Sequence, residues 1–129
     1  MTQIPASHRD ILEKKSFAHV ATVDANGVPQ VTPVWVDFDG ELVWINSATG
    51  RKKDRNLRAR ASVAISVQDP DNPYRYLGMQ GEVVEITEEG GAAHIHKLSR
   101  KYNGRDYDLP ADQTRVIYKI KPTRVWTMG

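Results

Sequence analysis

The sequence predicts a mainly β domain with short helices, whose strands close into a barrel that pairs as a homodimer. Short apolar runs alternate with tight turns such as residues 24–27 (Asp-Ala-Asn-Gly), which typically join antiparallel strands. The run over 41–46 is apolar on both faces, so both of its faces need cover, as in a barrel wall. Because few segments favour helices, a second copy of the chain is the natural cover for the outside of the barrel.

Length and composition restrict the class of protein. A chain of 129 residues indicates one domain over 1–129. No apolar run is long enough to cross a bilayer and the first residues lack the apolar core of a secretion signal, so we expect a cytoplasmic protein without a membrane partner. The absence of cysteine excludes disulfides and a cysteine nucleophile. The net charge of +2 is small for a dedicated nucleic-acid binder, so no nucleic-acid partner is expected.

The N-terminal half is expected to contain one helix followed by three strands. Ser7 is a suitable N-cap for the helix, and Ile11 and Leu12 give it an apolar face. Alternating apolar residues then predict strands, in the first of which His19 is expected to be packed. Pro33 interrupts the second strand and indicates a bulge, an edge strand or a contact with a ligand. These four elements cover residues 7–15, 17–23, 28–38 and 41–46.

The C-terminal half is expected to alternate helices with strands. A basic helix of about ten residues comes first, with Leu57 and Ala61 facing the core. Gly78 and Gly81 lie in a long strand and indicate bulges or close approaches of the backbone. Pro122 separates the last two strands. These elements cover residues 51–60, 62–67, 74–86, 87–102, 114–120 and 123–128.

The segment over 47–60 concentrates positive charge at a strand-to-helix junction. It holds six basic residues and one acidic residue, in a chain whose net charge is only +2. The free N–H groups and the dipole of a helix N-terminus favour an anion such as phosphate. Lys53 and Asn56 are three residues apart, share one helix face and are expected to be surface groups. The side chains able to contact one anion here are Ser47, Thr49, Arg51, Lys53 and Asn56.

Two other interpretations of this segment stay open. A solvated amphipathic helix would pair Asp54 with Arg58 four residues later, and charge runs are commonly no more than wet surface. On spacing alone this interpretation carries as much weight as an anion site. A nucleic-acid patch is the weakest of the three, because no aromatic residue is interleaved for base stacking.

Other candidate residues give little direct chemistry. Backbone groups near Pro33 could bond the edge of a planar heterocycle beside a wall formed by Trp35, and a bulged strand with a core tryptophan is the alternative. His94 and His96 are two residues apart, which is not the spacing of a helical zinc pair. No nucleophile motif, phosphate loop or acid–base pair is visible. We therefore assign no catalytic residue and no metal site, and expect a cofactor to carry any reactive atom.

Four segments occur in an order that is more specific than any one of them. They are residues 17–23 (Phe-Ala-His-Val-Ala-Thr-Val), 26–34 (Asn-Gly-Val-Pro-Gln-Val-Thr-Pro-Val), 51–57 (Arg-Lys-Lys-Asp-Arg-Asn-Leu) and 76–83 (Tyr-Leu-Gly-Met-Gln-Gly-Glu-Val). Together they resemble the flavin- and deazaflavin-dependent oxidoreductases related to pyridoxamine 5′-phosphate oxidase. The resemblance spans nearly the whole chain and is closest to the short branch that uses the deazaflavin coenzyme F420. It implies a split β-barrel of the FMN-binding type, homodimeric, with the cofactor in a groove between two protomers.

The resemblance also implies roles for single residues. A basic R-x-K-x-x-N-L segment, here 51–57, binds the cofactor phosphate in the family. The segment 32–35 would run along the ring system, and the segment 79–81 would lie near the phosphate and the ring. Tyr74 and Tyr76 would line the substrate pocket. The implied cofactor-binding residues are Thr32, Pro33, Val34, Trp35, Ser47, Thr49, Arg51, Lys52, Lys53, Asn56, Met79, Gln80 and Gly81.

The implied activity is hydride transfer between F420 and a small electron-poor organic acceptor. FMN is the alternative cofactor because both molecules carry a ribityl phosphate, and a non-catalytic flavin-binding protein is a further alternative. The C-terminal segment by which true pyridoxamine phosphate oxidases hold their substrate is not recognised, so we expect no vitamin B6 oxidation. F420 also has an acidic glutamyl tail, which Arg55, Arg58 and Arg105 would either meet or leave to solvent.

Overall fold

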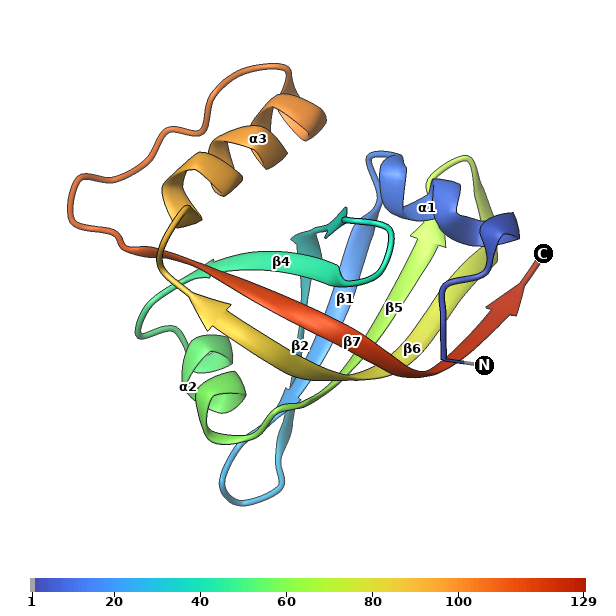
Figure 1. Ribbon diagram of the computed structural model, residues 1–129, viewed down its shortest axis with the longest axis horizontal. Coiled ribbons are helices and arrows are strands. Elements are labelled where there is room, and N and C mark those ends of the chain that lie inside the picture. Colours follow the sequence, from blue (N-terminus) through green and yellow to red (C-terminus); the bar gives the residue numbers. More distant parts are fainter. Residues whose placement is uncertain (1) are drawn as a thin grey trace.

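The computed structural model describes residues 2–129, and one curled antiparallel sheet dominates it (Figure 1). The mainly β class with short helices is therefore confirmed. The strands are β1 (Phe17–Val23), β2 (Pro29–Trp35), β3 (Asp37–Phe38), β4 (Val43–Ala48), β5 (Ser62–Asp69), β6 (Asn72–Thr87) and β7 (Arg115–Met128), in the sheet order β2-β1-β5-β6-β7-β4-β3. The helices are the 3-10 turn η1 (Ala6–His8), α1 (Arg9–Glu13), α2 (Lys52–Ala59) and α3 (Gly91–Asn103). None of the helices within residues 2–129 has the length and apolarity needed to span a membrane.

The sheet is split between its two end strands, β2 and β3. The chain passes from one to the other through Val36 alone, whose N–H donates to the Tyr102 hydroxyl at 3.0 Å. The single strand predicted over 28–38 is thus two strands, and the closed barrel predicted from strand patterning is an open one. Pro33 lies on an edge strand, where a residue without an N–H is tolerated, so one of the three expectations for it is confirmed.

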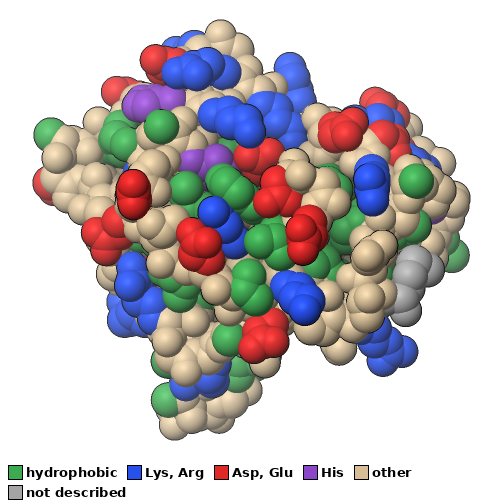
Figure 2. All heavy atoms as spheres, in the orientation of Figure 1, with side chains coloured by type: hydrophobic (Ala, Val, Ile, Leu, Met, Phe, Trp, Pro, Cys, Tyr) green, Lys and Arg blue, Asp and Glu red, His purple; other side chains and the backbone are tan. Residues whose placement is uncertain are grey.

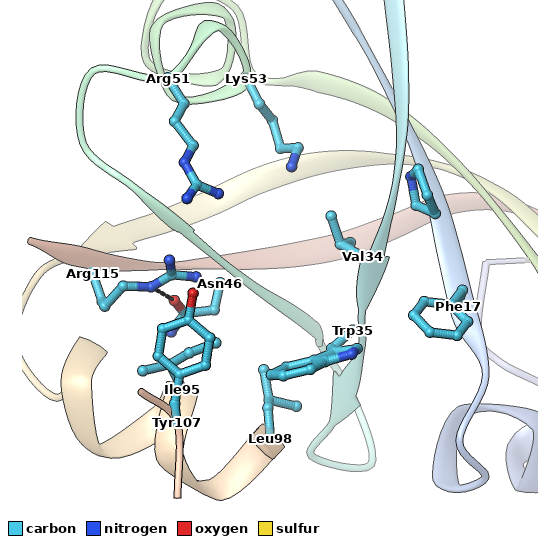
Figure 3. Close-up of a pocket in the computed structure, with 11 residues that line it drawn as sticks. Phe17, Val34, Trp35, Asn46, Arg51, Lys53, Ile95, Leu98, Tyr107 and Arg115 are labelled. Atoms are coloured by element: carbon cyan, nitrogen blue, oxygen red, sulfur yellow. Dashed lines mark hydrogen bonds between the residues drawn. The ribbon is translucent and has the colours of Figure 1, made fainter. Parts of the chain in front are cut away.

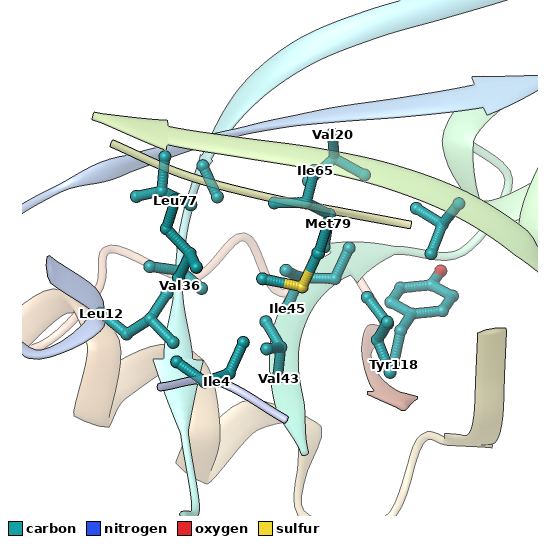
Figure 4. Close-up of a cluster of buried hydrophobic side chains, with 14 of the residues drawn as sticks. Ile4, Leu12, Val20, Val36, Val43, Ile45, Ile65, Leu77, Met79 and Tyr118 are labelled. Carbon is teal, nitrogen blue, oxygen red and sulfur yellow. The ribbon is translucent and has the colours of Figure 1, made fainter. Parts of the chain in front are cut away.

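The hydrophobic core fills the inside of the curled sheet, with α1 packed over one end (Figures 1 and 4). Ile45, Ile65 and Met79 come from different strands, are at most 2 % exposed and meet there. Burying each such side chain contributes about 1.5–3 kcal/mol. Strand β4 is covered on both faces, as predicted. It spans Val43–Ala48, whereas the predicted strand spanned 41–46. This core holds the sheet in a fixed curvature and so fixes the distance between its open ends.

Several element boundaries differ from the sequence prediction. The two last predicted strands form the single strand β7. The pairing of β6 with β7 shifts register at Gln80/Gly81, opposite Pro122, so the strand continues through the proline. Helix α3 begins at Gly91 and not at residue 87, because Thr87 still pairs with Ile117 in the sheet. Residues 88–90 form a turn between β6 and α3, in which Gly90 has φ 77°.

Two inward-facing assignments were wrong. His19 is exposed, because its strand neighbours Ala18 and Val20 occupy the buried face. Ala61 is exposed because α2 ends at Ala59, two residues before it. Leu57 is buried, as predicted.

Asp54 anchors α2 to the barrel. Its carboxylate accepts hydrogen bonds from the Gly50 N–H at 3.0 Å, from Arg58 Nε at 2.9 Å and from the Tyr118 hydroxyl. The predicted i,i+4 pair of Asp54 and Arg58 is therefore confirmed. Gly50 adopts φ 84°, a conformation that favours glycine. As a result, the N-terminus of α2 points to the open side of the sheet.

A second charged cluster ties α1 to the β5–β6 hairpin. Arg75 bonds Asp10 at 2.7 Å and Asp69 at 2.7 Å, and Lys14 bonds Asp69 at 2.9 Å. We call Asp10, Lys14, Asp69 and Arg75 the α1 cluster. It joins segments that are far apart in the sequence and closes one end of the core.

Candidate cofactor-binding groove

A cavity of about 200 Å³ lies at the opening between β2 and β4, bordered by α2 and α3 (Figure 3). Its lining residues are Phe17, Pro33, Val34, Trp35, Asn46, Arg51, Lys53, Ile95, Leu98, Tyr107 and Arg115. A second cavity of about 230 Å³ shares Pro33, Val34, Arg51 and Lys53 with the first and adds Gln30, Thr32 and Lys52. We call the two together the β2 groove, because β2 forms one wall along its whole length.

Three cationic side chains converge at one end of the β2 groove (Figure 3). Within residues 2–129, no carboxylate lies within ion-pair distance of Arg51, Lys53 or Arg115. Arg115 donates only to neutral groups, Asn46 Oδ1 at 2.8 Å and Gln113 Oε1 at 2.9 Å. Lys53 and Arg115 are buried and Arg51 is exposed. Such a group of cations without a counter-charge is suited to an anion.

Burial and neighbouring positive charges lower the pKa values of Lys53 and Arg115. Burial first, and then the charges of Arg51 and Arg115, lower the pKa of Lys53 to about 8. Burial also lowers the pKa of Arg115, and Arg51 adds to that effect. Both shifts show that the protein itself disfavours these charges. An anion bound between the three side chains would reverse the shifts.

The other end of the β2 groove is apolar and aromatic. Trp35 stacks on Tyr102 with ring centroids 5.2 Å apart and meets Tyr107 edge-on at 6.1 Å. Ile95 and Leu98 of α3 complete this wall. Trp35 is only partly buried and lines the groove, as expected of an apolar wall. The groove therefore suits a ligand that joins an anionic group to a planar ring.

Seven of the thirteen predicted cofactor-binding residues meet in this groove. They are Thr32, Pro33, Val34, Trp35, Arg51, Lys52 and Lys53. The Thr32 Oγ1 atom is buried and has no hydrogen-bond partner within the described residues. Lys52 is more loosely held, with Nζ 3.7 Å from Asp24 Oδ2.

The expectation that Lys53 and Asn56 are surface groups was wrong. Lys53 is 9 % exposed and Asn56 is 4 % exposed. Asn56 Nδ2 donates to Thr22 Oγ1 at 3.0 Å, so the amide docks α2 on β1 and does not face the groove. Ser47 is buried, and its Oγ has no hydrogen-bond partner among residues 2–129. Thr49 is exposed, and neither residue lines the groove.

Within one chain, the predicted β6 residues lie away from the groove. Met79 is fully buried in the core. Gln80 and Gly81 border a different cavity on the outer face of the sheet. Tyr74, which is 81 % exposed, and Tyr76 follow the β5–β6 turn and do not line the groove either.

The sequence interpretation missed Arg115, Asn46 and Tyr107. Arg115 reaches the groove because β7 pairs with β4, an arrangement that local periodicity does not reveal. A charged residue directly before the apolar run over 116–118 was the one available signal. Phe17 was predicted only as part of a strand, and Ile95 and Leu98 were not singled out.

The remaining basic residues of the segment 47–60 agree with the solvated interpretation. Arg58 pairs with Asp54 at 2.9 Å and lies 3.7 Å from Glu88, and Arg55 donates to the Gly50 carbonyl. Arg105 is exposed. Lys and Arg side chains are visible at the α2 corner, at the lower left of the space-filling view (Figure 2). The basic helix thus has one face in water and one face in the groove.

Comparisons with known proteins agree with this geometry. Residues 4–129 match the pyridoxamine 5′-phosphate oxidase family. A solved structure named F420 reductase is 40 % identical, with 95 % of this chain and 98 % of that chain covered and a TM-score of 0.86. No match was found among the curated proteins.

Two more distant structures share the fold. A conserved hypothetical protein from Mycobacterium tuberculosis is 23 % identical, with coverages of 98 % and 86 % and a TM-score of 0.77. A putative pyridoxamine 5′-phosphate oxidase from Listeria innocua is 19 % identical, with 94 % of each chain covered and a TM-score of 0.71. The match over nearly the whole chain, together with the curled and split sheet, shows that this chain belongs to the pyridoxamine 5′-phosphate oxidase family of split-barrel proteins.

Proposed function

We propose that this protein is an oxidoreductase that binds coenzyme F420 in the β2 groove and passes hydride to a small electron-poor organic acceptor. The observation that carries the proposal is the meeting of three cations without counter-charges at one end of an aromatic groove. Similarity to a protein named F420 reductase supports the choice of cofactor. When bound, the deazaflavin ring supplies the hydride chemistry, and the protein supplies position and environment.

The residues present fit a ribityl phosphate followed by a flat ring. Arg51, Lys53 and Arg115 would hold the phosphate through charge-assisted hydrogen bonds. The buried Thr32 Oγ1, which has no partner within the described residues, is free to bond a polar ligand atom beside them. The unpaired edge of β2 would orient the ring, and Trp35 would shield one part of it from water.

The other predicted residues would act less directly. In this proposal Asn56 supports the site by holding α2 against Thr22. Ser47 and Thr49 lie next to the turn that precedes α2, so they would shape that turn. Gln80 and Gly81 lie on the outer face, and from there they would reach a cofactor only in a second protomer.

A homodimer is the second part of the proposal. Strand pairing places Ala21, Val31, Ala64 and Gly78 on the outer face, whose small residues allow close approach. Exposed apolar residues of β1, β2 and β7 are Phe17 (52 %), Val31 (62 %), Trp126 (40 %) and Met128 (53 %). Phe17 and Pro33 line both the β2 groove and a cavity of the outer face, so a partner there would border the groove. Tyr74 and Tyr76 would then lie near the substrate side of the partner's groove.

Cofactor titration tests the proposal. F420 and FMN are added separately to the purified protein, and binding is followed by fluorescence. Arg51→Met should weaken F420 binding by about 10-fold or more, since a hydrogen bond to a charged group contributes about 1.5–3 kcal/mol. Lys121→Met, which removes an exposed lysine outside the groove, is the matched control. Absence of binding by both cofactors would refute the proposal.

Turnover then separates the alternatives. Reduced F420 should be oxidised by enone or quinone acceptors faster with the protein than in buffer. F420 binding without this acceleration would identify a non-catalytic carrier, and tighter binding of FMN would identify a flavin enzyme. Sedimentation should give a dimer mass that Val31→Glu reduces to monomer mass; a wild-type monomer at micromolar concentration would overturn the dimer.

A further inference from the structure

A continuous chain of buried polar side chains lies between β3, β4 and α3 and ends at the β2 groove. Asp37 Oδ2 lies 3.0 Å from His94 Nε2, His94 Nδ1 lies 3.1 Å from Asn46 Nδ2, and Asn46 Oδ1 lies 2.8 Å from Arg115 Nε. His94, Asn46 and Arg115 are each at most 7 % exposed. Side chains buried this deeply have to satisfy each other's hydrogen bonds, so their arrangement is restricted.

The hydrogen bonds of this chain run in one direction. Arg115 only donates, so it requires Asn46 Oδ1 as the acceptor and turns Asn46 Nδ2 away from itself. Nδ2 donates to the Gly91 carbonyl at 3.1 Å and to His94 Nδ1, which must therefore be unprotonated. His94 then carries its proton on Nε2 and donates it to Asp37.

Asp37 is suited to be the end of this chain. Although burial opposes its charge, hydrogen bonds from His94 and Lys97 hold the pKa of Asp37 well below its usual range. Lys97 Nζ lies 3.1 Å from the same oxygen, Asp37 Oδ2. The carboxylate thus remains an acceptor and fixes both the tautomer and the ring orientation of His94.

The chain holds Arg115 in place without neutralising it. The direct partners of Arg115, Asn46 and Gln113, are neutral, and its guanidinium lies 5.3 Å from the ring centre of Tyr107. No hydrogen bond to Arg115 Nη2 is present within residues 2–129. Like-charge repulsion from Arg51 and Lys53 would push a flexible arginine away, so a rigid and uncharged support is needed here.

We infer that Asp37, His94 and Asn46 are positioning residues that hold Arg115, with its charge free, against the anionic group of the groove's ligand. The inference rests on the proposed function, in that it takes a phosphate-bearing ligand for the β2 groove. It adds a phosphate-binding residue far in sequence from the basic helix and a support that lies outside the groove. A network that only stabilised the fold would not affect the preference for phosphate.

The test measures the preference for phosphate and not affinity alone. Dissociation constants are determined by fluorescence for two pairs of ligands: F420 with the deazaflavin that lacks the phosphate, and FMN with riboflavin. The ratio within each pair is the preference. Arg115→Met should reduce it by about 10-fold, because one charge-assisted hydrogen bond to the phosphate is lost. Arg100→Met is the matched control, since Arg100 lies on α3 and bonds Asp106 instead.

Three further variants separate positioning from folding. His94→Phe should reduce the preference, and His94→Gln should recover part of it, because an amide can still accept from Asn46 and donate to Asp37. Asn46→Asp has nearly the same shape but places a carboxylate on Arg115, so it should lower the preference although the side chain stays in place. Thermal unfolding of each variant shows that it is folded. If His94→Phe does not fold, the preference for phosphate measured for Asn46→Asp tests the positioning role.

The outcomes are distinct. Unchanged preference in Asn46→Asp and in the folded His94 variants, with a lower preference in Arg115→Met, would overturn the positioning role. Unchanged preference in Arg115→Met would overturn the inference as a whole. If the wild-type protein binds none of the four compounds, the proposed function itself fails, and the inference fails with it.

Discussion

The α1 cluster and the cations of the β2 groove contain the same kinds of side chain with opposite surroundings. In the α1 cluster, Arg75 is bonded to Asp10 and Asp69, and these bonds raise its pKa further above the usual value. In the groove, Lys53 has no carboxylate partner within the described residues, and burial lowers its pKa to about 8. The direction of the shift separates the two roles. Arg75 already has its counter-charges in the protein, whereas the charge of Lys53 is left for an external anion to balance.

Removing both helix cations of the groove should have the largest effect on ligand binding. Arg51→Met with Lys53→Met should lower the affinity for a phosphate-bearing cofactor by at least about 100-fold, since each lost charged hydrogen bond costs about 1.5–3 kcal/mol. The melting temperature should stay the same or rise, because mutual repulsion is removed. Fluorescence titration and thermal unfolding measure the two quantities. A large loss of stability with unchanged affinity would show that these cations belong to the fold.

The α1 cluster should give the opposite result. Asp69→Asn should lower the melting temperature, because Lys14 and Arg75 lose the carboxylate that joins α1 to the β5–β6 hairpin. Cofactor affinity should not change, because no member of the α1 cluster lines the β2 groove. Asp69 alone among them borders a neighbouring cavity. Weaker cofactor binding in a well-folded Asp69→Asn protein would contradict the separation of the two regions.

Lowering the pH should reduce the contribution of the α1 cluster to stability, independently of the groove. The backbone N–H of Asp71, then Lys14 and Arg75, hold the pKa of Asp69 well below its usual range. A group with a depressed folded-state pKa stabilises the protein fully above its unfolded pKa of about 3.9 and loses that contribution as the pH falls further. The difference in melting temperature between wild type and Asp69→Asn should therefore be constant from pH 7 to 5 and shrink below pH 4. A difference that does not depend on pH would rule out the ion pairs as its source.

Raising the pH should weaken cofactor binding in the groove, and this is the smallest of the predicted effects. A pKa of about 8 means that free Lys53 loses its proton above pH 8, whereas a bound phosphate would keep it protonated. Cofactor affinity should therefore fall by about 10-fold between pH 7 and 10, the loss of one charged hydrogen bond. Lys53→Arg should bind the cofactor with little dependence on pH in this range. An equal fall in both proteins would trace the effect to another group.

Local signals in the sequence were enough to find the helix side of the groove. The spacing of Arg51, Lys53 and Asn56 predicted a basic helix after a buried strand, and two of these three residues reach the groove. Asn56 was placed on the surface because helical spacing cannot show which face docks on β1. Pro33 marked an edge strand correctly, since the missing N–H is a local property.

The strand side of the groove could not be predicted in the same way. Arg115 and Asn46 meet because β4 pairs with β7 across about seventy residues, and that register depends on the packing of the whole core. His94 was considered only as a possible metal-binding pair with His96, although its hydrogen-bond partner Asp37 comes from another element. Gly81 was correctly predicted to mark an irregularity, but its pairing with Pro122 of the neighbouring strand could not be predicted from either strand alone.

The one-residue link at Val36 has a consequence for which ligands fit. Strand β2 continues through Val36 into β3, and β3 pairs with β4, so β2 and β4 are linked at the Trp35 end of the groove. In the proposed function, the planar ring of the cofactor would lie at this end, and its phosphate would lie at the α2 end, next to Thr32 and Lys52. Three steps of extended strand separate Thr32 from Trp35, about 10 Å at about 3.3 Å per residue. If the proposed function holds, strand β2 would select a ligand by the length of the linker between its ring and its phosphate.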